Sequence, residues 1–200
     1  LGAGAGIDCF LAARKVGRSG RVIGVDMTPE MIDRARENAR AGRYSNVEFR
    51  LGEIENLPAA DASVDAVISN CVVNLSTDKP RTFREAFRVL KPGGRMMVSD
   101  LVLARPLPRT IRDSVEAYAS CIAGAMLRDK YLAAIRAAGF RDVEVTSEQV
   151  YPADLLADGC CSPESLKDDG LEGGKALKHL SLVISLGVRA FKRGKRRGGS

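Results

Sequence analysis

Short apolar runs alternate with amphipathic stretches along most of the chain, and this alternation constrains the fold more than any other feature. The apolar runs, each of strand length, are 21–26, 46–51, 64–69 and 95–102. Apolar residues at helical spacing fill the intervening segments. Strands that alternate with helices form a mainly parallel sheet with helices on both faces. The sequence therefore predicts a doubly wound α/β fold.

One predicted helix has clear start and stop signals. Thr28 is expected to cap it, Pro29 suits its first position and Gly42 ends it. Its inward stripe is predicted to consist of Met31, Ile32, Ala35 and Ala39.

Four parts are predicted along the chain, whose 200 residues and 45% apolar content suffice for one core. These are a cofactor-binding core at 1–105, a helical lid and returning strand at 106–150, a loop or insertion with a closing strand at 151–192, and a disordered basic tail at 193–200. The glycine-rich turn at 1–6 has lost all but the last residue of the strand expected before it, so we expect the chain to be a fragment.

Cellular location and partners follow from the cysteines, the apolar runs and the charge. The five cysteines are odd in number and mostly far apart, unlike a secreted disulfide scaffold: Cys9, Cys71, Cys121, Cys160 and Cys161. No apolar run reaches the roughly 18 residues of a membrane span. We expect reduced thiols, a cytoplasmic location and no membrane contact.

The net charge of +6 is concentrated near the C-terminus. Five positive charges fall within 192–197, which leaves about +1 for the rest of the chain. Because interleaved aromatic residues and a base-reading motif are absent, we expect no nucleic-acid partner.

Three segments at predicted strand ends indicate a nucleoside-binding site. Gly2, Gly4 and Gly6 let the backbone approach a ligand closely. Asp26 ends the next strand, where a carboxylate accepts both ribose hydroxyls, and 51–55 follows the third strand, beside the expected adenine. Position 7 is Ile rather than the third glycine of the nicotinamide pattern, which argues against an oxidoreductase.

Cys71 follows the predicted strand 64–69, and ligands in doubly wound folds bind at the carboxyl ends of strands. A soft sulfur there suits a soft substrate atom. The alternative is that Cys71 is a small buried hydrophobe, as many cysteines without disulfides are.

Several motifs carry a family resemblance. The run Lys91-Pro92-Gly93-Gly94 before a strand ending at Ser99-Asp100, together with the glycine turn, resembles class I S-adenosylmethionine-dependent methyltransferases. Segments 24–31, 52–55, 69–76 and 118–125 resemble arsenite methyltransferases, and this likeness spans about residues 1–150.

The resemblance implies a Rossmann-like sheet of seven strands with the first truncated, and S-adenosylmethionine as cofactor. The cofactor-binding residues that it implies are Gly2, Gly4, Gly6, Asp26, Met27, Glu53, Ile54 and Asn70. It further implies Cys71 and Cys121 as ligands of trivalent arsenic and as the catalytic residues. Trivalent arsenic is soft, so convergent thiolates suit it; a third thiolate is expected upstream of the glycine turn.

The expected reaction transfers a methyl group to arsenite or methylarsenite. The arsenic lone pair attacks the sulfonium methyl group, so no general base is needed, and we expect no role for His179, the only histidine. A thiol reductant such as thioredoxin or glutathione is the expected partner. Two alternatives are a methyltransferase of a quinone or other small molecule, and a non-catalytic thiol protein that only binds arsenite.

Overall fold

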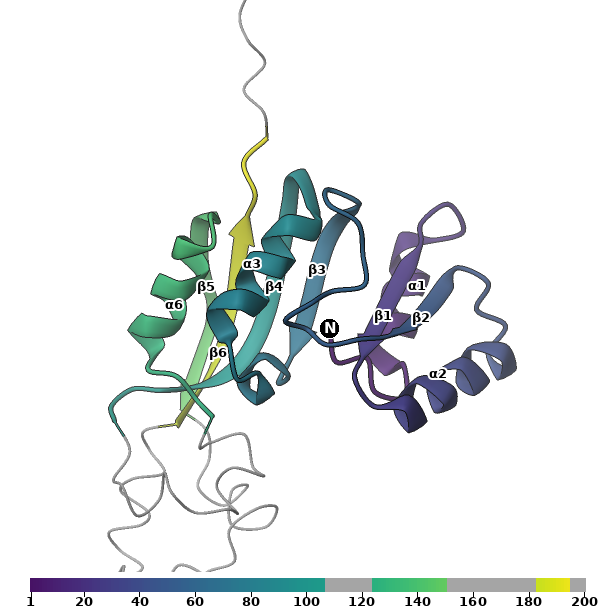
Figure 1. The fold of residues 1–200 in the computed structure, drawn as a ribbon, viewed down its shortest axis with the longest axis horizontal. Helices are drawn as coiled ribbons and strands as arrows, with labels where there is room; N and C mark the ends of the chain where they lie inside the picture. The colour runs from purple at the N-terminus through teal and green to yellow at the C-terminus, as the bar shows by residue number, and fades with distance from the viewer. Residues whose placement is uncertain (107–123, 151–182, 195–200) are drawn as a thin grey trace, which may run out of the picture.

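The computed structural model describes residues 1–106, 124–150 and 183–194 (Figure 1). Its elements are α1 Ile7–Val16, β1 Val22–Asp26, α2 Pro29–Ala41, β2 Val47–Leu51, β3 Val64–Asn70, η1 Val73–Leu75, α3 Lys79–Val89, β4 Leu90–Leu103, α6 Arg128–Ala137, β5 Arg141–Val150 and β6 Val183–Phe191. No helix in the described part of the chain combines the length and apolar character needed to cross a membrane.

The described strands form two groups. β1 pairs in parallel with β2, and a second sheet has the order β3-β4-β6-β5. β3 and β4 are parallel, whereas β6 runs antiparallel to both of its neighbours. The predicted alternating α/β fold is confirmed, and its described sheets are mixed: the pairs β1–β2 and β3–β4 are parallel, and the two pairs that β6 makes are antiparallel. The described residues contain six strands rather than the seven implied by the resemblance.

The first three residues lie between the two strand groups. The Leu1 amino group donates to the Ile68 carbonyl oxygen at 2.7 Å, and the Ala3 amide donates to that of Val25 at 2.9 Å. Both acceptors lie near the carboxyl ends of their strands. The glycine turn therefore begins beside the carboxyl ends of β1 and β3.

Two hydrophobic cores fix these strands. α3 and α6 cover one face of the four-stranded sheet (Figure 1), where Phe83 packs edge-on against Tyr131 with ring centroids 5.1 Å apart. Both side chains are buried, and each such burial contributes roughly 1.5–3 kcal/mol. A smaller core under α1 and α2 contains Cys9, Ile32, Ala35, Ala39 and Phe49.

The structure corrects two details predicted for α2. Met31 is 40% exposed and not part of the inward stripe, because the two strands below accommodate only the narrower row of Ile32, Ala35 and Ala39. Thr28 occupies the N-cap position but its side chain makes no capping hydrogen bond. Its backbone amide instead donates to Asp26 Oδ1 at 3.0 Å.

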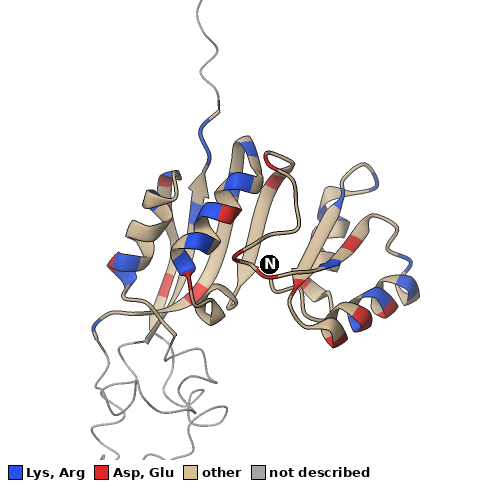
Figure 2. Cartoon of the chain, viewed as in Figure 1, with Lys and Arg blue, Asp and Glu red and all other residues tan. Residues whose placement is uncertain are grey.

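The C-terminal strands join the same sheet as the core. The expected closing strand is β6, which lies between β4 and β5. β4 begins at Leu90, ahead of the predicted start at 95, and Gly93 and Gly94 exchange backbone hydrogen bonds with Lys192. Residues 107–123 of the expected lid, residues 151–182 of the expected loop or insertion and residues 195–200 of the expected tail lie outside the described residues. Acidic and basic residues alternate along α2, whereas α3 carries mostly basic residues (Figure 2).

Candidate functional site

The segments that follow β1, β2 and β3 meet at one edge of the fold, because parallel strands end on the same side. Asp26 ends β1 and Met27 follows it, Glu53 and Ile54 belong to the segment after β2, and Asn70 ends β3. The Gly52 amide donates to the Asp26 carbonyl oxygen at 2.9 Å and so joins the first two segments.

The glycine turn needs glycine for different reasons at different positions. Gly2, Gly4 and Gly6 have φ angles of 60°, 50° and 100°, a region that side chains disfavour. A Cβ at Gly2 would clash with the Val72 side chain, and one at Gly6 would lie 2.7 Å from the Phe10 ring. No atom lies within 4 Å of a Cβ built at Gly4. The backbone at Gly4 therefore faces open space that a ligand can fill.

Asp26 fixes the turn through its side chain. Its Oδ2 accepts from the Gly4 amide at 2.8 Å, while its Oδ1 accepts from the Thr28 amide. A carboxylate has about four acceptor positions, so each oxygen keeps capacity for one further donor. Asp26 can hold the turn and accept ribose hydroxyls at once.

The other predicted cofactor residues differ in exposure. Met27 is 72% exposed, and Glu53 and Asn70 are also exposed. Ile54 is 9% exposed, with its side chain in the core, so it offers a ligand mainly its backbone. All four lie at the carboxyl edge, as predicted.

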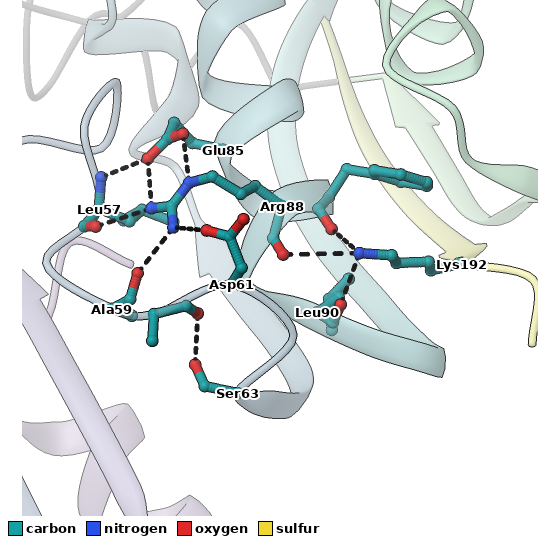
Figure 3. A network of polar contacts seen from close by, with 10 residues as sticks. Leu57, Ala59, Asp61, Ser63, Glu85, Arg88, Leu90 and Lys192 are labelled. Carbon is teal, nitrogen blue, oxygen red and sulfur yellow. Dashed lines mark hydrogen bonds and ion pairs between the residues drawn. The ribbon is translucent and has the colours of Figure 1, made fainter.

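A charged network that the sequence analysis missed anchors the segment after Ile54 (Figure 3). Arg88 of α3 donates to the carbonyl oxygens of Leu57 at 3.0 Å and Ala59 at 2.8 Å. It also pairs with Glu85 at 2.7 Å, and Glu85 accepts from the Leu57 amide at 2.8 Å. Hydrogen bonds from Glu85 and Asp61 raise the pKa of Arg88, and the Arg88 hydrogen bond lowers the pKa of Glu85. The only sequence signal was the Glu85–Arg88 spacing of three residues on a helix.

Cys71 lies directly after β3, as predicted, and is exposed. The alternative of a buried hydrophobe is therefore wrong. Its φ of 54° falls in the left-handed region, which costs a side-chain-bearing residue roughly 1–2 kcal/mol. Its amide donates to the Ser99 carbonyl oxygen at 2.8 Å, which holds this strained residue to β4.

Buried polar side chains lie beneath the loop that follows Cys71. Asn74 Nδ2 donates to the Leu101 carbonyl oxygen at 2.6 Å, and Lys79 Nζ donates to the carbonyl oxygens of Asn74 and Ser76 at 3.1 and 2.9 Å. Burial lowers the pKa of Lys79, and the neighbouring carboxylates of Asp100 and Glu55 oppose this shift. The loop is thereby fixed from within the protein.

Asp100 and Tyr131 extend this buried group. The Tyr131 hydroxyl donates to Asp100 Oδ2 at 2.7 Å, and both residues are at most 1% exposed. Burial raises the pKa of Asp100 to about 6, against the opposing hydrogen bond from Tyr131. Burial and then the Asp100 charge raise the pKa of Tyr131. Sequence reasoning used Asp100 only as part of a family motif and missed this pair.

The remaining cysteines divide into one that is described and three that are not. Cys9 is buried in α1, as expected for a packing thiol, and burial raises its pKa. Cys121, Cys160, Cys161 and His179 lie outside the described residues. Gly124, three positions after Cys121, packs on the Cys71 loop: a Cβ there would lie 2.5 Å from the Asn74 carbonyl oxygen.

Comparison with known proteins agrees with this arrangement. Residues 1–147 match a family model described as a methyltransferase domain. The chain is 54% identical over 145 residues to the arsenite methyltransferase of Halobacterium salinarum, covering 72% of this chain and 37% of that protein. It is 39% identical over 135 residues to the human arsenite methyltransferase, covering 63% of this chain and 36% of that protein.

A solved structure shows the same likeness. The crystal structure of an arsenic(III) S-adenosylmethionine methyltransferase from Chlamydomonas reinhardtii matches all of this chain and 63% of its own, with a TM-score of 0.72 and 33% identity. The chain thus spans well under half the length of the two curated relatives. With its glycine turn, acidic strand end and family match over residues 1–147, this chain belongs to the methyltransferase domain family.

Proposed function

We propose that the protein transfers a methyl group from S-adenosylmethionine to trivalent arsenic held by Cys71 and Cys121. The observation that carries the proposal is the contact between the Val72 side chain and Gly2. Val72 follows Cys71 in the chain, so this contact places the neighbour of the exposed thiol against the glycine turn. A substrate on Cys71 would therefore lie beside a nucleoside bound at that turn.

The residues at the carboxyl edge fit S-adenosylmethionine. The open backbone at Gly4, between Gly2 and Gly6, suits close approach of the ligand, and Asp26 suits the ribose hydroxyls. We assign the adenine side to Met27, Glu53 and the Ile54 backbone, and the donor side near Cys71 to Asn70.

The second sulfur is assigned to Cys121. It precedes Gly124 by three residues, and Gly124 contacts the Cys71 loop at Asn74. Three residues of chain span at most about 11 Å, a length that allows Cys121 to reach this loop. The relatives named arsenite methyltransferase support the same substrate, and arsenite and methylarsenite are the proposed acceptors.

The proposed reaction requires the protein to align the two reactants and does not require it to transfer a proton. When bound, S-adenosylmethionine supplies an electrophilic methyl group on a sulfonium. The arsenic lone pair forms the new As–C bond, and the electrons of the broken S–C bond leave with the sulfur of S-adenosylhomocysteine. Cys71 and Cys121 orient the arsenic, and the cofactor residues orient the methyl carbon in line with it.

The same electron count implies a reductant. Donating its lone pair takes arsenic formally from the trivalent to the pentavalent state, so a thiol donor such as thioredoxin or glutathione must restore the trivalent form before another cycle. Because this chemistry needs reduced cysteines, we place the protein in the cytoplasm.

Replacing either cysteine tests the proposal in the full-length protein. We expect Cys71→Ser and Cys121→Ser to lower formation of methylated arsenicals at least a hundredfold, because an oxygen ligand holds soft arsenic poorly. Chromatography of the arsenic products measures the effect. Cys9→Ala is the matched control, since Cys9 is buried in α1.

Cofactor binding and turnover distinguish the alternatives. Undiminished product from Cys71→Ser would contradict the thiol assignment. Arsenite-independent release of S-adenosylhomocysteine with a quinone acceptor would favour the other methyltransferase class. Tight arsenite binding with no release at all would indicate a binding protein.

A further inference from the structure

A partly buried hydrogen bond joins the cofactor side of the proposed site to the thiol side. Glu55, two residues after Glu53, accepts from the Ser76 hydroxyl, and Ser76 lies five residues after Cys71. Ser76 is 6% exposed. Glu55 and Ser76 thus form a tether between two loops that are far apart in sequence.

The thiol end of the tether is fixed on several sides. Ser76 Oγ also lies 3.0 Å from Thr82 Oγ1 and accepts from the Asp78 amide at 3.1 Å. The Ser76 carbonyl oxygen accepts from Lys79 Nζ. Ser76 is thereby held to the start of α3, and its amide donates to the Val73 carbonyl oxygen of η1 at 3.1 Å, two residues after Cys71.

The cofactor end is fixed as well. Leu57, two residues after Glu55, is held by Glu85 and Arg88 of α3 (Figure 3). A ligand that positions Glu53 and Ile54 therefore also positions Glu55, which lies between them and the anchored Leu57. Because the Glu55–Ser76 hydrogen bond is held at both ends, a change in the position of Glu55 also changes the position of Ser76.

We propose that Glu55 is a positioning residue that couples occupancy of the cofactor site to the geometry of the Cys71 thiol, with Ser76 as its partner. This inference rests on the proposed function. Because the tether links the two loops, the first ligand selects the loop arrangement that both ligands bind, and the second ligand no longer bears the cost of selecting it. The coupling is therefore positive, and by linkage each ligand raises the affinity for the other by the same factor.

Calorimetry on the full-length protein measures this factor. The dissociation constant of arsenite is determined without and with saturating S-adenosylhomocysteine, which permits no turnover. We expect a ratio of about fivefold or more in the wild-type protein, within the usual range of such couplings. The reciprocal titration of S-adenosylhomocysteine with and without arsenite must give the same ratio.

Four variants separate positioning from general destabilisation. Glu55→Ala and Ser76→Ala remove the tether, so their ratios should approach one. Glu55→Gln keeps an acceptor oxygen and should retain most of the coupling. Asp65→Ala removes an exposed carboxylate paired with Lys91 and should leave the ratio unchanged. Circular dichroism confirms folding, and if Glu55→Ala is unfolded, Ser76→Ala decides.

The outcomes distinguish this inference from the proposed function. A wild-type ratio of one, or the wild-type ratio in both Glu55→Ala and Ser76→Ala, overturns the coupling alone. Arsenite binding that survives in Cys71→Ser overturns the substrate assignment and the coupling with it.

Discussion

Individual residues at the carboxyl edge perform two tasks each. Asp26 holds the glycine turn through Gly4 and keeps acceptor capacity for a ligand. Cys71 exposes its thiol while its backbone adopts a left-handed conformation. Such conformations persist where surrounding contacts enforce them. Two hydrogen bonds to β4 provide that enforcement, one from the Cys71 amide to the Ser99 carbonyl oxygen and one from Asn74 Nδ2 to the Leu101 carbonyl oxygen.

Asp100 gives a residue-scale prediction about pH. Its pKa is about 6 in the folded protein, above the ordinary 3.8. The folded state therefore holds this proton more tightly, so the stabilisation is present below pH 4 and is lost as pH rises through about 6. The difference corresponds to about 3 kcal/mol. Asp100→Asn removes this dependence.

Urea denaturation at about pH 4.5, below the pKa of Asp100, and at about pH 8, above it, measures the effect. The free energy of unfolding of Asp100→Asn, relative to wild type, should increase by about 2–3 kcal/mol between the two conditions. The exposed Asp65→Asn is the control and should show no such change. A pH-independent difference for Asp100→Asn would contradict a raised pKa.

At the scale of elements, α3 carries the anchors of both loops of the site. Glu85 and Arg88 hold the segment after β2, while Thr82 and Lys79 contact the loop after β3. One helix therefore sets the distance between the cofactor side and the thiol side. The sequence indicated this helix from its apolar face, but its polar contacts reach residues up to 31 positions away.

Removing Arg88 tests this role of α3. Arg88→Met leaves the Glu85 carboxylate without its cation and frees Leu57 and Ala59, which should lower the free energy of unfolding by about 2 kcal/mol. It should also weaken S-adenosylhomocysteine binding severalfold, because Glu53 and Ile54 lose their anchored neighbours. Thermal melts and calorimetry measure both. Arg84→Met, at an exposed position of the same helix, should change neither; equal effects in the two variants would refute the assignment.

On the scale of the whole molecule, the end of β6 closes the fold against α3. Lys192 Nζ donates to the carbonyl oxygens of Phe87 and Leu90, both at 2.7 Å (Figure 3), and lies 4.5 Å from the Phe87 ring centroid. These carbonyls end a helix, where a cation is favourable. Residues more than 100 positions apart are thus joined at the edge opposite the site.

Lys192→Met should therefore destabilise the protein by about 1–2 kcal/mol while leaving S-adenosylhomocysteine affinity within twofold. Arg193→Met is the matched control, because Arg193 is exposed. Chemical denaturation of both variants decides between a specific anchor and a general effect of lowering the positive charge. Equal stability losses would favour the latter.

The sequence was most informative about features that depend on local pattern. Strand positions, the glycine turn, the acid at Asp26 and the place of Cys71 after β3 all follow from short motifs and from the coincidence of parallel strand ends. It was wrong about Met31, because how wide a face α2 buries depends on the strands beneath it.

By itself, then, the sequence determined the alternating fold, the family and the edge at which we propose the site, since each is encoded within a few residues. Only the tertiary structure decided how that edge is held. The Glu55–Ser76 tether, the Arg88 anchor, the buried Asp100–Tyr131 pair and the insertion of β6 between β4 and β5 join residues distant in sequence. Polar side chains form such contacts only after packing has excluded water and fixed the neighbouring groups, so no local sequence pattern predicts these contacts.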